Sequence, residues 1–207
     1  MLGIDHYFAF LLAGILLNLT PGADTIYILS RSIAQGKKAG IVSVLGIATG
    51  TCIHTLLAAF GLSLLLAQSS ALFQTVQYAG AAYLVFLGIK LLLTESPLTQ
   101  TTARENQKLS TIYRQAVVTN VLNPKVALFF LSFLPQFINP EYARGPLPFL
   151  ILGFSFLTTG TLWCLVIAYS ASFMTERLRR NERIARTMNK VCGMVFVALG
   201  LQLALKK

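Results

Sequence analysis

Two long stretches of this chain contain no Asp, Glu, Lys or Arg: everything between Lys38 and Lys90, and residues 145–175. A helix needs about 20 apolar residues to cross the hydrocarbon core of a bilayer, so the first stretch has room for two crossings and the second for one. The chain of 207 residues is 55% hydrophobic and 12% charged, with a mean hydropathy of +0.68. Soluble domains carry about 25% charged residues. These features predict an all-α integral membrane protein.

Apolar runs separated by polar linkers predict six membrane spans. We place the spans at residues 7–33, 39–67, 71–93, 112–137, 147–174 and 187–205. One linker is long, and its polar sequence ESPLTQTTARENQKLS separates three spans from three. The predicted organisation is a first three-helix repeat at 1–94, a cytoplasmic linker at 95–110 and a second three-helix repeat at 111–207.

The first and fourth spans each contain a proline where a continuous helix is expected. The first carries NLTPGAD at residues 18–24, and the fourth carries NVLNPKVALFF at residues 120–130. Proline lacks a backbone donor and clashes with the carbonyl four residues before it, so we predict that helix 1 is broken at Pro21 and helix 4 at Pro124. The matched breaks indicate two related halves. Because each half has an odd number of spans, the second is predicted to lie inverted relative to the first, as in many secondary transporters.

The chain has 17 Lys and Arg residues against 7 Asp and Glu, and the basic residues alternate between loops. Most fall after span 1, around the central linker, or between spans 5 and 6: Arg31, Lys37, Lys38, Lys90, Arg104, Lys108, Arg114, Arg177, Arg179, Arg180, Arg183, Arg186 and Lys190. Cytoplasmic loops carry such an excess, which predicts that both termini lie on the opposite, outer side. A nucleic-acid partner is disfavoured, because the basic loops are short and contain few aromatic residues.

Each break is expected to restart a helix near the middle of the bilayer. Thr20 and Asn123 are suited to cap the new helices, with Pro21 and Pro124 at the first helical positions. Both new N-termini point at one midplane region, where free N–H groups and positive dipole ends suit a carboxylate. Carbonyls left unpaired before each break can accept from an ammonium group or a coupling cation. Such a site matches a zwitterion, whereas two kinks needed only for packing are the alternative.

Two charges lie inside predicted spans. A charged side chain at the middle of a transmembrane helix costs about 2.5 to 3.5 kcal/mol, so each needs compensation. Asp24 lies in the first turn after Pro21, where a carboxylate favours the helix dipole and a purely structural cap is the simpler interpretation. Lys125 opposes the dipole at the same place in span 4, so we predict a partner: Asp24, a substrate carboxylate, or each in turn. Snorkelling of the lysine to the membrane surface is the alternative.

His54 lies alone in the middle of span 2. It suits proton transfer, although a lone helical histidine is more often a packing or hydrogen-bonding residue. In the same span, Gly46 and Gly50 form a G-x-x-x-G pair, which favours the close approach of another helix.

Other chemistries lack their motifs in this sequence. The three cysteines lie singly in apolar segments, and clustered Asp, Glu, His or Cys ligands for a metal are missing. The chain contains no H-E-x-x-H, G-x-S-x-G or P-loop string, so no catalytic residue, metal or cofactor is predicted. Export of another small solute or metal ion, an intramembrane enzyme and a membrane scaffold remain competing hypotheses.

Four segments together resemble the LysE/RhtB family of bacterial amino-acid exporters: NLTPGAD, SRSIAQGKKAG, AGAAYLVFLGIKLL and NPKVALFFLSFLPQF. The resemblance extends over essentially the whole chain. It implies export of amino acids such as lysine, arginine, homoserine, threonine or leucine across the inner membrane, driven by the proton motive force. The family's Pro-Gly-Pro stands here as Pro-Gly-Ala at residues 21–23. By the matching motifs, the family's functional positions carry over to Asn18, Pro21, Gly22, Asp24, Asn123, Pro124 and Lys125.

The combined prediction is a multi-pass protein of the bacterial inner membrane that exports neutral amino acids, of the homoserine, threonine or leucine type, by proton antiport, with both termini periplasmic. The predicted substrate-binding residues are Asn18, Thr20, Pro21, Gly22, Asp24, Asn120, Asn123, Pro124 and Lys125. The predicted proton-coupling residues are Asp24 and His54. The expected partners are the amino acid, protons and the lipid bilayer. The sequence leaves open whether the protein forms a homodimer.

Overall fold

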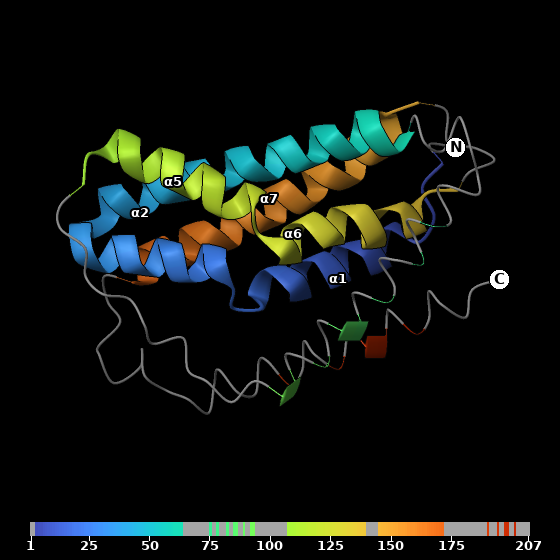
Figure 1. Ribbon diagram of the computed structural model, residues 1–207, viewed down its shortest axis with the longest axis horizontal. Coiled ribbons are helices and arrows are strands. Elements are labelled where there is room, and N and C mark those ends of the chain that lie inside the picture. The colour runs from blue at the N-terminus through green and yellow to red at the C-terminus, as the bar shows by residue number, and fades with distance from the viewer. Residues whose placement is uncertain are drawn as a thin grey trace.

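The computed structural model describes residues 3–63, 107–139 and 145–171, together with single helical positions between 75 and 93 and between 190 and 201. The predicted spans at 71–93 and 187–205 and most of the predicted linker at 95–110 therefore lie outside the continuously described residues. Within those described ranges every regular element is a helix, and strand-like pairing is limited to one isolated bridge between Ile4 and Ile138. Figure 1 shows the helices as one elongated bundle.

The N-terminal part consists of α1 (Tyr7–Leu19), α2 (Ala23–Leu57) and a π-helical turn, η1 (Ala58–Leu62). A non-helical segment at residues 20–22 separates α1 from α2. Gly36, at a φ of 77°, interrupts α2 and lets the chain double back into a second arm (Figure 1). A left-handed conformation of this kind suits glycine, which has no Cβ to clash. The first predicted span thus corresponds to α1 plus the first arm of α2, and the second to the second arm plus η1.

The other described helices come from the second half of the chain. They are α5 (Leu109–Val121), α6 (Pro124–Leu128), a π-helical turn η2 (Phe129–Phe133), a 3₁₀ turn η3 (Leu134–Phe137) and α7 (Leu147–Ser170). The axis bends by 45° between the segments Leu109–Val121 and Pro124–Phe137. By contrast, α7 is continuous over 24 residues.

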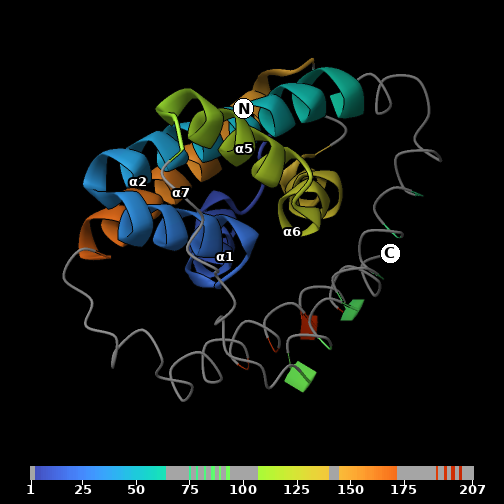
Figure 2. The same cartoon turned by 60° about the vertical axis from the view of Figure 1, so that its left-hand side comes forward.

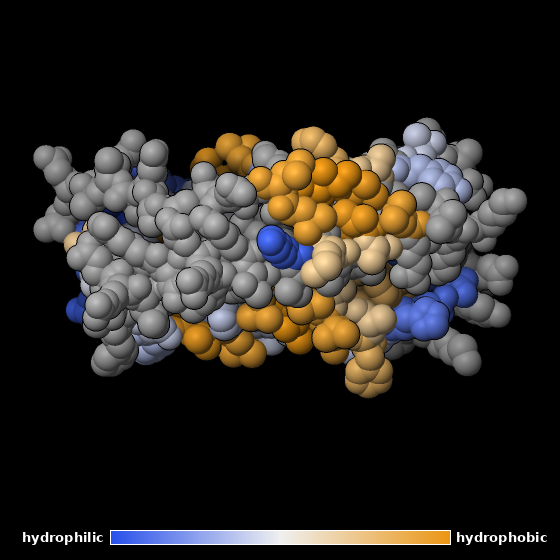
Figure 3. Space-filling model, turned by 90° about the horizontal axis from the view of Figure 1, so that it is seen from below, coloured by the Kyte–Doolittle hydropathy of each residue, from blue (hydrophilic) through white to orange (hydrophobic). Residues whose placement is uncertain are grey.

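Two described helical segments, Ala23–Leu62 and Leu147–Ser170, each contain a stretch long and apolar enough to cross a membrane, and the bent pair from Leu109 to Phe137 is a third if it is counted as one span. Large apolar side chains, such as Phe8, Leu122 and Leu162, lie exposed on the outside of the bundle. Figure 3 shows hydrophobic side chains gathered over the middle of one face. Such a surface suits contact with lipid. The chain is therefore a helical, multi-pass membrane protein.

Helix α2 packs against α5 and α7, as both ribbon views show (Figures 1 and 2). Glycines let these helices approach closely. A Cβ at Gly46 would lie 2.5 Å from the Cβ of Ala116, and one at Gly50 would lie 2.7 Å from the Cβ of Asn120. The G-x-x-x-G pair predicted to admit another helix thus faces α5.

Contacts at the two ends of the bundle show which segments of the chain lie at each end. At one end, the Asp5 amide donates to the carbonyl of Phe137, and the Asn139 amide donates to the carbonyl of Gly3. At the other end, the side chain of Gln35 donates to the carbonyl of Gln107 at 2.9 Å. The N-terminal segment therefore lies at the end where η3 finishes, and the turn at Gly36 lies where α5 begins (Figure 1).

Candidate functional site

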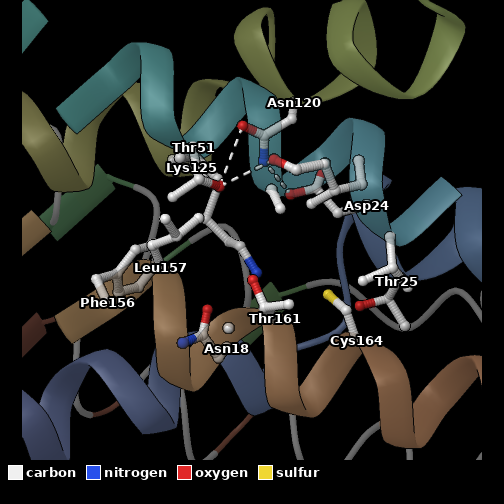
Figure 4. Close-up of a pocket in the computed structure, with 15 residues that line it drawn as sticks. Asn18, Asp24, Thr25, Thr51, Asn120, Lys125, Phe156, Leu157, Thr161 and Cys164 are labelled. Atoms are coloured by element: carbon white, nitrogen blue, oxygen red, sulfur yellow. Dashed lines mark hydrogen bonds between the residues drawn. The ribbon is translucent and has the colours of Figure 1, made fainter. Parts of the chain in front are cut away.

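The two interruptions in the helices border a common pocket in the middle of the bundle (Figure 4). This pocket encloses about 40 Å³, which is room for a few water molecules or a small polar group. Its polar lining comes from Asn18, Asp24, Thr25, Thr51, Asn120, Lys125, Thr161 and Cys164. Its apolar lining includes Val44, Ile47, Val126, Phe156 and Leu157. Four of the predicted site residues, Asn18, Asp24, Asn120 and Lys125, thus share one cavity.

The backbone at the first interruption differs from the expected cap. Thr20 is the C-cap of α1, and its hydroxyl donates to the carbonyl of Leu16 at 2.9 Å instead of capping the next helix. Gly22, in an extended conformation, is the N-cap of α2 and contributes no side-chain bond. The Thr20 hydroxyl reaches back one turn to a carbonyl that also accepts from the Thr20 amide at 3.1 Å. Small hydroxyl residues commonly make such a bond to their own helix.

At the second interruption the chain follows the expected cap. Asn123 is the N-cap of α6, its side-chain oxygen accepts from the amide of Lys125 at 3.1 Å, and Pro124 occupies the first turn. Asn120, one turn earlier, is 1% exposed. Its carbonyl accepts from the amide of Asn123 at 3.0 Å, which closes the end of α5.

Asp24, in the first turn of α2, is held by Asn120 across the pocket. The carboxylate Oδ2 accepts from Asn120 Nδ2 at 2.9 Å, and the Asn120 Oδ1 accepts from the Thr51 hydroxyl at 3.4 Å. These contacts link the first arm of α2, the second arm of α2 and α5 (Figure 4). Within the described part of the chain, Asp24 Oδ1 and Asn123 Nδ2 are buried and make no hydrogen bond. Of these two residues only Asp24 lines the pocket, and the Asn123 side chain lies near enough to the Asp24 carboxyl to interact with it. Asp24 is therefore the group that a molecule in the pocket can reach.

Lys125 reaches from the start of α6 to the end of α1. Its Nζ donates to the carbonyl of Thr20 at 2.9 Å and to that of Leu17 at 3.1 Å. A cation is favourable at a helix C-terminus, where the last carbonyls lack partners. The lysine that opposes the dipole of its own helix therefore complements the dipole of α1. A Cβ at Gly22 would lie 3.2 Å from the Nζ, so glycine leaves room for this contact.

His54 lies beside the pocket rather than in its lining. It is 8% exposed, its ring stacks on Phe130 with 5.7 Å between centroids, and its Nε2 lies 3.3 Å from the carbonyl of Asn120. The histidine thus contacts the end of α5, as Lys125 contacts the end of α1. This contact connects His54 to Asp24 through a single residue, Asn120.

Sequence reasoning missed several polar residues of the lining. Thr25, Thr51, Thr161 and Cys164 all border the cavity. Small hydroxyl residues within an apolar span are a weak signal, because they can bond to a carbonyl of their own helix, as Thr51 does at 3.1 Å. The run of polar residues at 158–161 was the clearest sign available that α7 lines a polar site.

Arg31 is also buried, although its sequence position suggested a cytoplasmic loop. It is 6% exposed and donates to the side-chain oxygens of Gln35, Gln107 and Gln115 at 3.3, 2.8 and 3.0 Å. Its guanidinium also lies over the ring of Tyr27, 5.6 Å from the centroid. Arg31 follows Asp24 by two helical turns, so both lie on the face of α2 that meets α5.

Comparison with known proteins places the chain in a family. The model of the LysE type translocator matches residues 15–207. An uncharacterised membrane protein of Vibrio cholerae is 34% identical over 206 residues, which cover 99% of this chain and 98% of that protein. The leucine efflux protein of Salmonella typhimurium is 29% identical over 203 residues, which cover 98% of this chain and 96% of that protein. No solved structure matches. The resemblance inferred from the motifs is thereby confirmed: the chain belongs to the LysE type translocator family.

Proposed function

We propose that this protein exports neutral amino acids from the bacterial cytoplasm by proton antiport. Membership of a translocator family and the leucine efflux relatives support export of a small molecule of this class. The observation that carries the proposal is the pocket lined by both Asp24 and Lys125, between two interrupted helices. Opposite charges in one cavity suit a zwitterion, and charged residues inside membrane-spanning helices usually mark a functional site.

The contacts at the site suggest how an amino acid binds. Its ammonium group would approach Asp24 Oδ1, the carboxylate oxygen without a hydrogen bond in the described structure. Its carboxylate would approach the Lys125 ammonium, which lines the same pocket. Its side chain would lie toward Phe156 and Leu157. Among the described lining residues there is no second carboxylate for a cationic side chain, which favours a neutral amino acid.

The inverted-repeat architecture is part of this proposal. The interruptions at residues 20–22 and 122–123 lie in corresponding places of the two halves, and each is followed by a charged residue in the new first turn. In the proposed arrangement the spans at 71–93 and 187–205 complete the two three-helix repeats. Discontinuous helices around a midplane site are typical of inverted-repeat transporters.

Proton coupling is assigned to Asp24 and His54. Asp24 is the acidic group of the pocket, and His54 reaches it through Asn120. Moving one charge across 100 mV yields about 2.3 kcal/mol, enough to sustain a concentration ratio of roughly 40-fold, given that a tenfold ratio costs about 1.4 kcal/mol. A single coupled proton is therefore sufficient to drive useful export.

Counterflow in proteoliposomes tests the proposal. Vesicles loaded with unlabelled leucine, threonine or homoserine should accumulate the same labelled amino acid, and an acidic external medium should accelerate net efflux from right-side-out vesicles. Labelled lysine and protein-free liposomes are the controls. Absence of exchange with every neutral amino acid would refute the function, and efflux that ignores the pH gradient would refute proton antiport.

A further inference from the structure

The C-terminal end of α1 presents a site for a primary ammonium group. The last carbonyls of a helix lack intrahelical partners and carry its negative dipole end. Here the carbonyls of Leu17 and Thr20 both accept from the Lys125 ammonium, at 3.1 and 2.9 Å. This group comes from a different half of the chain, across the pocket that Lys125 also lines. The contact is therefore a cation site built from backbone oxygens, and a side chain of the same protein fills it.

The group that fills this site has the same chemistry as the α-ammonium of an amino acid. Asp24 borders the same pocket, and its Oδ1 makes no hydrogen bond within the described residues. We propose that the carbonyls of Leu17 and Thr20 form an ammonium site that Lys125 and the α-ammonium of the transported amino acid occupy in turn. This inference rests on the proposed function. It adds that the substrate ammonium replaces the Lys125 ammonium at these carbonyls when the substrate binds.

The local backbone is arranged for this exchange. Gly22 has a φ of −157°, an extended conformation open to any residue, so the backbone does not require glycine there. A Cβ at that position would meet the Lys125 Nζ at 3.2 Å and the Cε at 3.5 Å. Glycine at this place therefore leaves space for the ammonium group to enter and leave the end of α1.

Exchange of the two cations has a consequence for the transport cycle. The Leu17 carbonyl also accepts from the Thr20 amide at 3.1 Å, whereas among the described residues the Thr20 carbonyl accepts from Lys125 alone. Net efflux requires the carrier to return without substrate, and the Thr20 carbonyl then needs another donor in a medium where unpaired acceptors are costly. Lys125 supplies that donor. Exchange of one amino acid for another does not include the substrate-free return, because the substrate ammonium pairs the carbonyls in both directions. Lys125 should thus matter more for net efflux than for exchange.

The test compares Lys125→Met with the parental protein in proteoliposomes. At saturating amino acid on both sides, exchange by the variant should keep its maximal rate, with a raised KM. Net efflux into substrate-free medium should fall about tenfold or more, the factor that an unpaired buried acceptor is worth. Lys38→Met, at an exposed position of the Gly36 turn, makes the same chemical change and should alter neither rate.

The outcomes separate this inference from the proposed function. Equal loss of exchange and efflux in folded Lys125→Met, or loss of neither, would overturn the shared ammonium site while parental exchange still supports the transporter. A parental protein without amino-acid exchange would overturn both. Gly22→Ala provides a second variant that keeps the lysine but crowds its ammonium. It should lower net efflux more than exchange, and should add no further loss to Lys125→Met; a larger effect on exchange would contradict the inference.

Discussion

At the scale of single residues, Asn120 connects the functional groups of the pocket. Its side chain donates to Asp24 and accepts from Thr51, and its carbonyl faces His54. A buried network of this kind stabilises a structure only when its members stay in place, because an unpaired polar group in a low dielectric is costly. The position of Asn120 in turn depends on Gly50, which lies directly against it.

Gly50→Ala should therefore disturb the site from the second arm of α2, which contributes no charged residue to the pocket lining. The new Cβ would lie 2.6 Å from Asn120 Oδ1, so α2 and α5 must separate or Asn120 must turn away from Asp24. Overpacking of this kind costs about 1–3 kcal/mol. We expect a lower melting temperature of the detergent-solubilised protein and reduced exchange in proteoliposomes.

Gly61→Ala is the matched control for this prediction. It makes the same change in a helical segment, but a Cβ at Gly61 has nothing within 4 Å among the described atoms. Its melting temperature and exchange should equal those of the parental protein. If Gly50→Ala behaves like Gly61→Ala, the contact between Gly50 and Asn120 does not hold the site.

At the scale of elements, the interruption between α1 and α2 presents carbonyl oxygens to Lys125, which lines the pocket. Pro21 has no N–H, so it cannot donate to Leu17, and the Leu17 carbonyl accepts from the Thr20 amide and from the Lys125 ammonium, both at 3.1 Å. The second interruption is maintained differently, since Asn123 caps α6 and Pro124 begins it. Replacing a proline should therefore reduce transport most at Pro21, because the new backbone amide competes there with Lys125 for the Leu17 carbonyl.

Pro21→Ala tests this competition. The alanine amide can donate to the Leu17 carbonyl and let α1 extend toward α2, which displaces Lys125 from that oxygen. Amino-acid exchange should fall while the amount of membrane-inserted protein stays close to parental. Pro146→Ala is the control, because Pro146 is the N-cap of α7, where a missing N–H costs no helical bond. Parental exchange by Pro21→Ala would mean that the interruption serves only packing.

At the scale of the whole molecule, the contacts at the two ends of the bundle show which segments lie on the same side of the protein. Ile4 pairs with Ile138, so the N-terminal segment and the end of the fourth predicted span lie on the same side. Gln35 meets Gln107 at the opposite end, beside Arg31. An excess of basic residues at that end predicts that it faces the cytoplasm.

Reporter fusions measure this orientation. An enzyme active only in the periplasm should be active when fused after Gln68 or Lys207, and inactive when fused after Gln100 or Asn181. Opposite activities at all four points would reverse the orientation. Activity at both Gln68 and Gln100 would show that the chain does not cross the membrane between them, and would remove the inverted repeat from the proposal.

Much about this protein was determined by local sequence. Apolar run lengths indicated a helical membrane protein, because a bilayer requires long apolar helices with internally paired backbones. Pro21 and Pro124 predicted interruptions in their helices, because the missing N–H of a proline acts on its own helix whatever surrounds it. The motifs also indicated the translocator family, and the charged and amide residues beside the prolines include Asn18, Asp24, Asn120 and Lys125 of the pocket.

Only the tertiary structure decided which groups meet. The sequence pointed to a carboxylate as the partner of Lys125, and Asp24 does line the same pocket. It gave no sign that the ammonium also donates to the carbonyls of Leu17 and Thr20 at the end of another helix. It assigned Arg31 to a loop, but that residue is buried and donates to Gln107 and Gln115 from the second half of the chain. Such pairings depend on how helices cross and how closely glycines let them approach. A local pattern records neither quantity, because both arise from segments that are far apart in the chain.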